Sequence, residues 1–168
     1  MDITLLGYHG TTLDNALSIV RNSDFKKSNK DNEWLGHGVY FFELYEKAEW
    51  WVSKRNKPAI IETKILVPEK YYLDLDKPSE VDKLGEFIKF IEESGKKFTV
   101  KGDETQKRCA VINLYMQSCG FKVISATLLS TNKKYKKQLN SIGFHRSEKQ
   151  ICVHDTQCIV YNELEIVS

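Results

Sequence analysis

The sequence predicts an α+β domain in which a mixed or antiparallel sheet is flanked by helices. Short apolar segments typical of strands cluster toward both ends of the chain, and segments with helical periodicity lie between them. The chain contains neither Gly-x-Gly-x-x-Gly nor Gly-x4-Gly-Lys-Ser/Thr, which argues against dinucleotide-binding and P-loop folds. With 168 residues, 41% of them hydrophobic, the chain is sized for one core, so we expect a single domain over residues 1–168.

The charge balance and the cysteines exclude some functional classes. The formal charge of +2, from 25 basic and 23 acidic residues, does not require a polyanionic partner, so any nucleic-acid surface must be local. Met1–Leu5 lacks a basic region followed by an apolar run, and no stretch has the ~18 apolar residues of a membrane span. We therefore expect a cytoplasmic protein with no membrane partner. Four cysteines without a Cys-x-x-Cys pair predict reduced, mostly buried thiols.

The first strand and helix are predicted on either side of a polar turn. Leu5–Tyr8 is apolar and short, which favours a strand, and Gly10–Thr12 follows as a turn. Thr11, with Asp14 three residues later, is typical of a helix N-terminal cap. His9 is therefore expected where a strand passes into a helix. The apolar face predicted for this helix consists of Leu13, Ala16, Leu17 and Val20.

The segment Asn22–Glu33 is polar and predicts an exposed loop. It carries Lys26, Lys27 and Lys30 and could close over a ligand. Trp34, at its end, is the apolar exception.

Two further strands and a helix are predicted in the next part of the chain. In Gly38–Phe42 the alternation of side chains places Val39 and Phe41 on one face and Tyr40 and Phe42 on the other. A helix is expected through Ala48, Trp51 and Val52. The branched aliphatic residues of Ala59–Val67 favour a strand, Tyr71–Leu75 is a further strand candidate, and Pro68 and Pro78 punctuate them.

Two longer helices are predicted in the middle of the chain. Ser79 with Asp82 suggests the cap of a helix that ends at Gly95. Its apolar stripe comprises Val81, Leu84, Phe87, Ile88 and Ile91. A third helix is expected over Glu104–Ser118, ending at Gly120, and it should bury Ala110, Val111 and Leu114.

The C-terminal third is predicted to return to strands. Phe121–Ala126 favours a strand, and Lys133–Lys137 is a basic loop. The last two apolar runs, Gln150–Val153 and Cys158–Tyr161, are separated by four polar residues and predict a hairpin or a bulged pair.

Three segments, taken in order, resemble the motifs of a known family. Tyr8–Thr11 (Tyr-His-Gly-Thr), Gly36–Phe41 (Gly-His-Gly-Val-Tyr-Phe) and Thr156–Asn162 are similar to the three motifs of ADP-ribosyltransferases with a His-Tyr-Glu triad. Diphtheria toxin and the poly(ADP-ribose) polymerases share that triad. The resemblance implies an ADP-ribosyltransferase-like split sheet with flanking helices, and NAD as the ADP-ribose donor.

The resemblance also implies roles for individual residues. His9 would hold a ribose hydroxyl, and Gly10 would offer its backbone groups to the nicotinamide carboxamide because glycine lets a ligand approach the main chain. Tyr40 would stack on the nicotinamide ring. Trp34 either lines the donor loop or belongs to the core, and His37 either contacts the adenosine half of NAD or is exposed. The predicted NAD-binding set is His9, Gly10, Thr11, Trp34, His37, Gly38 and Tyr40.

Gln157 departs from the family pattern. It stands where a catalytic acid usually orients the nicotinamide ribose, so the predicted catalytic set is His9, Tyr40 and Gln157. An amide orients a hydroxyl through hydrogen bonds but supplies no full charge. Alternatives are a separate acid reaching the site, namely Glu148, Asp155 or Glu163, or a shifted alignment that gives the role to Glu163 or Gln150.

No metal is expected. Cys152, His154 and Cys158 alternate in a way that puts ligands on one face, but their spacing fits no common zinc site and a fourth ligand is not evident.

The basic run Lys133–Lys137 contains Tyr135 and is followed by His145 and Arg146. This composition suits contact with phosphates and stacking on a base, or else a solvated loop. We therefore expect a mono-ADP-ribosyltransferase whose acceptor is RNA or DNA slightly ahead of protein. By analogy it is the toxin of a bacterial toxin-antitoxin or phage-defence module, with an antitoxin as a partner. The alternatives are a non-catalytic NAD or ADP-ribose binding module, a protein-directed transferase, and, disfavoured by the lack of an arginine-rich pattern, a tRNA 2'-phosphotransferase.

Overall fold

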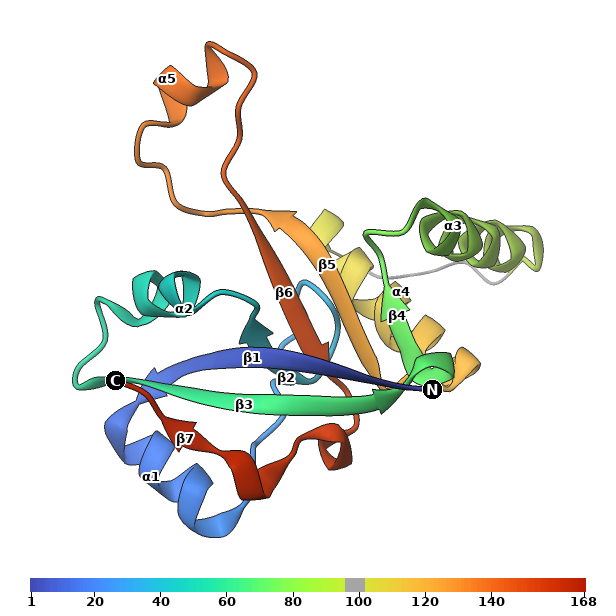
Figure 1. The fold of residues 1–168 in the computed structure, drawn as a ribbon. Helices are drawn as coiled ribbons and strands as arrows, with labels where there is room; N and C mark the ends of the chain where they lie inside the picture. The colour runs from blue at the N-terminus through green and yellow to red at the C-terminus, as the bar shows by residue number, and fades with distance from the viewer. Residues whose placement is uncertain (96–101) are drawn as a thin grey trace.

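The computed structural model describes residues 1–95 and 102–168 as a seven-stranded mixed sheet with flanking helices (Figure 1). The strand order is β4-β5-β6-β2-β1-β3-β7, and only β4 and β5 run parallel. The predicted α+β class is therefore confirmed. The strands are β1 (Asp2–Thr12), β2 (Val39–Phe42), β3 (Pro58–Pro68), β4 (Tyr72–Asp74), β5 (Val123–Leu129), β6 (Ser147–Val153) and β7 (Glu165–Ile166); the helices are α1 (Leu13–Asn22), α2 (Tyr45–Val52), α3 (Pro78–Glu93), α4 (Glu104–Cys119) and α5 (Lys136–Asn140).

The sheet has a narrow junction in its middle. β1 pairs with β3 along its whole length, whereas β1 and β2, both described in full, are in register at one position, Tyr8 opposite Phe42. On the other side, β2 pairs with β6 over all four of its residues. The sheet therefore consists of one part with β1, β3 and β7 and another with β2, β6, β5 and β4. In Figure 1 the strands of the two parts run in clearly different directions.

Three apolar clusters hold the layers together. The largest lies under β1 and β3, where Phe25 and Ala16 pack against the sheet. In the second, Ile112 and Met116 of α4 cover β5. The third joins α2 to the sheet through Ala48 and Val52, together with Phe42 and Ile60. Helices α1, α2 and α4 thus each contribute buried side chains to these clusters.

Two helix starts differ from the sequence prediction. The N-cap of α1 is Thr12, whose side chain accepts a hydrogen bond from the Asn15 amide, and the predicted cap Thr11 is instead buried at the end of β1. Helix α3 begins at Pro78, so the predicted Ser79 cap is wrong. Proline is favoured at the first helical position because its missing N–H needs no partner there.

Three predicted helix faces were also wrong in part, and on α3 the expected stripe residue Val81 is exposed. On α1 only Ala16 is buried, and the expected face residues Leu13, Leu17 and Val20 are exposed. On α4 Val111 is buried as predicted, whereas Ala110 is only partly buried and Leu114 is exposed. The sequence offers several overlapping apolar stripes, and the position of the sheet selects among them. The α4 residues that are buried are Cys109, Val111, Ile112, Tyr115 and Met116.

Both ends of α4 are defined by local chemistry. Asp103 and Gln106 form a reciprocal capping box, in which each side chain accepts from the other residue's backbone amide. Gly120 ends the helix with φ +73°, as the sequence predicted, because glycine adopts the left-handed conformation without strain.

The predicted C-terminal hairpin does not form. β6 begins at Ser147 rather than Gln150, and residues 158–161 do not pair with it. Instead, short 3-10 turns cover Thr156–Cys158 and Tyr161–Glu163, and Ile159 forms an isolated bridge with Ile65 of β3. Burial of Cys158 and Ile159 against the largest cluster satisfies this apolar run without strand pairing. The predicted basic loop likewise contains the start of α5.

Other expectations concern cysteines and membranes. All four cysteines are free, and Cys119 alone among them is exposed, in agreement with the predicted reduced and mostly buried thiols. Within residues 1–95 and 102–168, no helix is long and apolar enough to cross a membrane.

The packing of α2 on β1 depends on a glycine. A Cβ atom added to Gly10 would lie 2.5 Å from Val52 Cγ1. We therefore expect Gly10→Ala to destabilise the fold by about 1–3 kcal/mol, as overpacking of a filled core does. Urea unfolding would measure this change.

Gly85 provides a matched control on α3, because nothing lies within 4 Å of its added Cβ. Gly85→Ala should stabilise the protein by about 0.5–1 kcal/mol through helix propensity. Equal effects of the two substitutions would contradict the close approach of α2.

Candidate functional site

A cleft of about 450 Å³ opens where the two parts of the sheet diverge. This volume is within the ~300–1,000 Å³ typical of small-molecule sites. Its walls come from the end of β1, the loop before β2, β2 itself, α2 and β6. The structure brings six of the predicted site residues together on these walls: His9, Gly10, Thr11, Trp34, Gly38 and Tyr40.

His9 bridges the gap between the diverging strands. Its Nδ1 lies 2.8 Å from the backbone oxygen of Tyr40, and because a carbonyl only accepts, Nδ1 carries the proton. The ring is held edge-on against Phe25, with centroids 5.1 Å apart, and tilted against Phe41. Burial lowers the pKa of His9, and the positive charge of Arg55 lowers it further, against the effect of the Tyr40 hydrogen bond. At neutral pH the ring is uncharged, with Nε2 as a hydrogen-bond acceptor.

Tyr40 is fixed by the loop that precedes its strand. Its hydroxyl donates to the Gly36 oxygen at 2.6 Å and accepts from the Leu35 amide at 2.9 Å. Burial raises the pKa of Tyr40, so the hydroxyl stays protonated and keeps both hydrogen bonds. The ring forms part of the cleft wall in a single orientation.

Further contacts hold this loop in place. His154 Nε2 donates to the Leu35 oxygen at 2.8 Å, and the His37 amide donates to Asn113 Oδ1 of α4 at 2.7 Å. Trp34 lines the cleft and lies under the Arg108 guanidinium, 4.7 Å from its ring centroid. The cation–π contact orients the indole, so Trp34 belongs both to the cleft and to the border of the core.

The glycines of the two motifs are explained by packing. The space that a Cβ would take at Gly10 is filled by Val52 of α2, and at Gly38 it is filled by Cys152 Sγ, 2.6 Å away. At both positions the missing side chain thus makes room for the protein itself. Both glycines also line the cleft, so their contact with a ligand stays a prediction.

Glu148 and Gln150 supply the polar side chains on the β6 wall. Gln150 lies opposite Phe42 in the β2–β6 ladder, and Glu148 is two residues away on the same face. Glu148 is only 7% exposed, and its Oε1 accepts a hydrogen bond from Gln150 Nε2 at 2.9 Å. The Glu148 carboxylate is therefore held in one orientation at the cleft wall and is largely shielded from bulk solvent.

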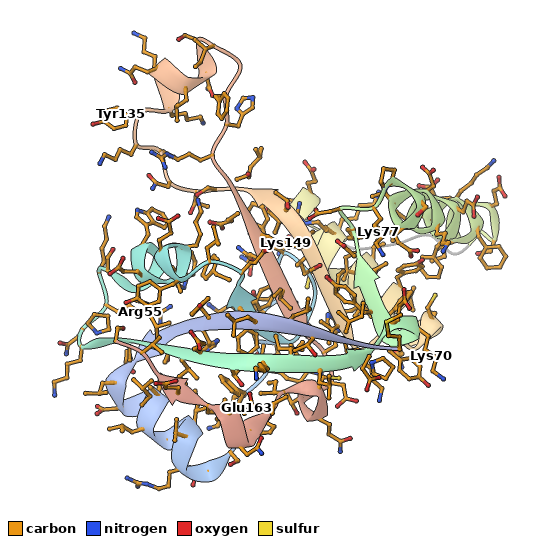
Figure 2. The ribbon with its side chains drawn as sticks, viewed as in Figure 1. Arg55, Lys70, Lys77, Tyr135, Lys149 and Glu163 are labelled. Carbon is orange, nitrogen blue, oxygen red and sulfur yellow. The ribbon has the colours of Figure 1, made fainter. Side chains whose placement is uncertain are left out.

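Basic side chains stand at the rim. Lys26 and Lys30 reach the cleft from the loop after α1. Arg55 reaches it from the segment after α2 (Figure 2). Glu33, which accepts a hydrogen bond from the Ser28 hydroxyl, lies on the same loop wall. The rim therefore combines positive charge with the aromatic surfaces of Trp34 and Trp51.

Two predicted site residues do not line the cleft. Gln157 is exposed in a 3-10 turn, and its neighbour Ile159 bridges β3 on the edge away from β1. The role that the sequence gave to Gln157 is therefore unsupported by its position, because its side chain is exposed and is not among the residues that line the cleft. His37 turns away from the cleft, and its Nε2 lies 3.0 Å from the Lys30 oxygen.

From the sequence, Glu148 and Gln150 were only alternatives to Gln157 in the catalytic role. Neither Arg55 nor Trp51 was predicted as a site residue. The alternation of Glu148, Gln150 and Cys152 was the available signal for β6, and it required extending the strand by three residues. Arg55 had no local signal, because it follows the helix without a motif. Among the described residues, no group of three or more His, Cys, Asp or Glu side chains is placed to hold a metal ion.

Comparisons with known proteins do not assign a family. No protein-family model matches the chain. Over 78 residues the chain is 33% identical to an uncharacterized protein of Methanocaldococcus jannaschii. The match covers 42% of this chain and 36% of that protein, so the chain spans little more than a third of its relative's length.

Acidification is expected to destabilise the protein through His9 and His154. Burial lowers the pKa of each in the folded state, so the unfolded chain binds protons more readily below a pH of about 6.5. The contribution of the two neutral histidines to the free energy of unfolding is complete above that pH. It is lost as the pH falls toward their pKa values in the folded state. The loss is about 1.4 kcal/mol for each unit of pKa lowering.

Urea unfolding between about pH 7.5 and about pH 5 measures this loss. The double variant His9→Gln/His154→Gln should have a flatter dependence on pH in that window. If the free energy of unfolding of the double variant depended on pH as steeply as that of the wild type, the loss could not be assigned to His9 and His154.

Proposed function

We propose that the protein is a NAD-dependent mono-ADP-ribosyltransferase. The observation that carries the proposal is the convergence of His9, Tyr40 and Glu148 on one cleft at the split of the sheet. A histidine, a tyrosine and an acid from three separate strands are the residue types of the family that the motifs resemble. Glu148 supplies the carboxylate that Gln157 lacks.

The cleft suits a dinucleotide in size and in chemistry. Tyr40 and Trp34 offer aromatic faces for flat rings, and Gly10 and Thr11 border the same space. Lys26, Lys30 and Arg55 supply positive charge for a pyrophosphate. We assign the nicotinamide ring to Tyr40 and a ribose hydroxyl to His9 Nε2, which is free to accept once Nδ1 is bound to Tyr40.

The reaction breaks the bond between the nicotinamide nitrogen and ribose C1'. The nitrogen takes the electron pair of that bond and leaves as neutral nicotinamide, while an oxygen or nitrogen of the acceptor forms the new bond to C1'. The acceptor's proton passes to a base, a role we assign to Glu148. Positive charge develops on the sugar during this step, and a buried carboxylate stabilises it more strongly than an amide does.

The position of Glu148 also bears on the alternative of a non-catalytic NAD or ADP-ribose binding module. That alternative depended on an amide in the catalytic position, so a carboxylate in the cleft supports the transferase over it. We retain a macromolecular acceptor, with RNA or DNA ahead of protein, and the role of a toxin in a bacterial toxin-antitoxin or phage-defence module.

Glu148→Gln tests the catalytic assignment with little change in shape. The amide keeps a hydrogen-bonding partner for Gln150 but loses the charge, so nicotinamide release from NAD should fall by about 100-fold or more. The affinity for NAD, measured by calorimetry, should change far less, because rim and ring contacts remain.

Gln157→Ala is the matched control and should retain wild-type release within about twofold, since surface substitutions away from a site are close to neutral. Loss of activity in Gln157→Ala together with full activity in Glu148→Gln would overturn the assignment and restore the sequence-based one.

Expression in bacteria tests the toxin role. Wild-type protein should arrest growth, and His9→Ala, Tyr40→Ala and Glu148→Gln should each relieve the arrest because each removes a cleft group. Colony counts after induction measure the effect, with immunoblots to equalise expression. Unimpaired growth with the wild-type protein would count against a toxin.

A further inference from the structure

The connection between β5 and β6 forms a projection that the cleft itself does not explain. We call residues 130–146 the β5–β6 excursion; it carries α5 at its tip and stands away from the sheet (Figure 1). The Ser130 amide donates to the Arg146 oxygen at 3.0 Å and closes its base. Within the excursion, all of which the structure describes, no residue is fully buried. Core packing therefore does not account for its composition.

The excursion carries charge of one sign. Its basic residues are Lys133, Lys134, Lys136, Lys137 and Arg146, and no Asp or Glu occurs between positions 130 and 147. The chain as a whole has a formal charge of only +2, so this is a local concentration of positive charge. Such a concentration favours a polyanion over a neutral or basic partner.

Large apolar side chains are exposed among these charges. Tyr135 is 60% exposed, Phe144 65% and Ile142 74%. Tyr135 adopts a positive φ of 57°, which a tyrosine rarely does, and its ring points outward at the tip (Figure 2). Exposed aromatic rings between basic side chains are the combination that stacks on unpaired bases while binding phosphates.

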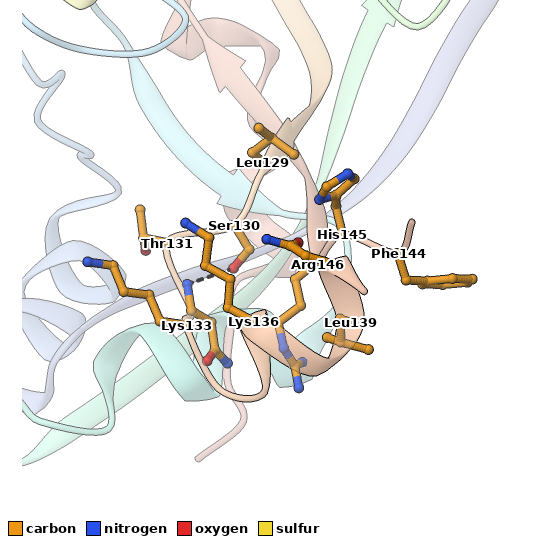
Figure 3. A pocket seen from close by; sticks show the side chains of 11 residues that line it. Leu129, Ser130, Thr131, Lys133, Lys136, Leu139, Phe144, His145 and Arg146 are labelled. Carbon is orange, nitrogen blue, oxygen red and sulfur yellow. Dashed lines mark hydrogen bonds between the residues drawn. The ribbon is translucent and has the colours of Figure 1, made fainter. Parts of the chain in front are cut away.

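A cavity of about 200 Å³ lies between the two arms of the excursion (Figure 3). Lys133, Lys136, His145 and Arg146 line it, together with Phe144. Thr131 lines both this cavity and the cleft that contains His9 and Glu148. The cavity of the excursion and the candidate site therefore meet at Thr131.

We propose that the β5–β6 excursion binds single-stranded nucleic acid and presents one nucleotide past Thr131 to the cleft. The lysines contact successive phosphates, and Tyr135 and Phe144 stack on unpaired bases. A duplex keeps its bases inside and offers these rings nothing to stack on. The presentation to the cleft rests on the proposed transferase function, whereas binding to the excursion does not.

Fluorescence anisotropy on the full chain without NAD tests the binding. The probes are a labelled single-stranded RNA, a single-stranded DNA and a DNA duplex of the same mixed sequence and length. Either single strand should bind at least ~10-fold more tightly than the duplex, and more weakly as salt rises. Lys133→Glu/Lys136→Glu/Lys137→Glu should weaken single-strand binding at least ~10-fold, and Tyr135→Ala/Phe144→Ala should weaken it without changing the charge.

Lys70→Glu/Lys77→Glu/Lys89→Glu is the control, because it changes the net charge by the same amount at exposed sites outside the excursion. Figure 2 shows Lys70 and Lys77 far from α5. It should bind within about threefold of wild type, since screened charges at a distance contribute little. Circular dichroism melts of all variants verify that each is folded.

The inference is overturned if the excursion variants bind single strands as tightly as wild type does, or if the duplex binds as tightly as the single strands. It is also overturned if the control loses as much affinity as the excursion variants, or if a poly-glutamate peptide displaces the oligonucleotide.

Incubation with labelled NAD then separates the nucleic-acid surface from the proposed transferase function. Excursion-dependent binding without nicotinamide release supports the surface and removes the transferase. Release of nicotinamide without nucleic-acid binding removes the surface and leaves the transferase, and the strand that acquires label distinguishes RNA from DNA.

Discussion

The hydrogen bond from His9 Nδ1 to the Tyr40 carbonyl is the contact on which the candidate site depends. β1 and β2 are in register only at Tyr8 and Phe42, and beyond that point the two parts of the sheet separate. A side chain, rather than a ladder amide, satisfies the Tyr40 oxygen across the gap. This bond spans the split, sets the tautomer of His9 and leaves Nε2 free. Its surroundings of Phe25 and Phe41 hold the ring and disfavour its charged form.

The opposite wall of the cleft is held differently, by side chains that form hydrogen bonds with the backbone of the short loop Leu35–His37. Tyr40, His154 and Asn113 each bind backbone groups of Leu35–His37, and Arg108 covers Trp34. These groups come from β2, α4 and the segment after β6, so the loop is held by elements far apart in sequence. Its basic neighbours Lys26 and Lys30 lie on exposed chain before it, which places a charged rim beside the aromatic wall.

The sequence located two of the three strands that form the cleft and misplaced the third. His9 and Tyr40 were predicted from short glycine-containing motifs, and the structure places them on one cleft. Gln157 was chosen because the Ile-Val-Tyr run after it resembles the end of a motif strand, but that run packs on β3 without pairing to β6. Glu148 lies before the apolar part of β6, where polar Ser147, Lys149 and Gln150 obscured the strand. Pairing with β5 and β2 makes that segment a strand, and pairing is invisible to local periodicity.

By itself the sequence determined the α+β class, the existence of most strands and helices, the end of α4 at Gly120 and the concentration of basic and aromatic residues before β6. These are properties of local composition and backbone preference, which act over a few residues. Only the tertiary structure decided which face of α1 and α4 is buried, why Gly10 and Gly38 lack side chains, and that Glu148 rather than Gln157 shares a cleft with His9. Those outcomes depend on contacts between residues distant in the chain, such as Val52 with Gly10 and Phe42 with Gln150. The register of the strands and the split in the sheet create these contacts, and no single segment of the sequence predicts either one.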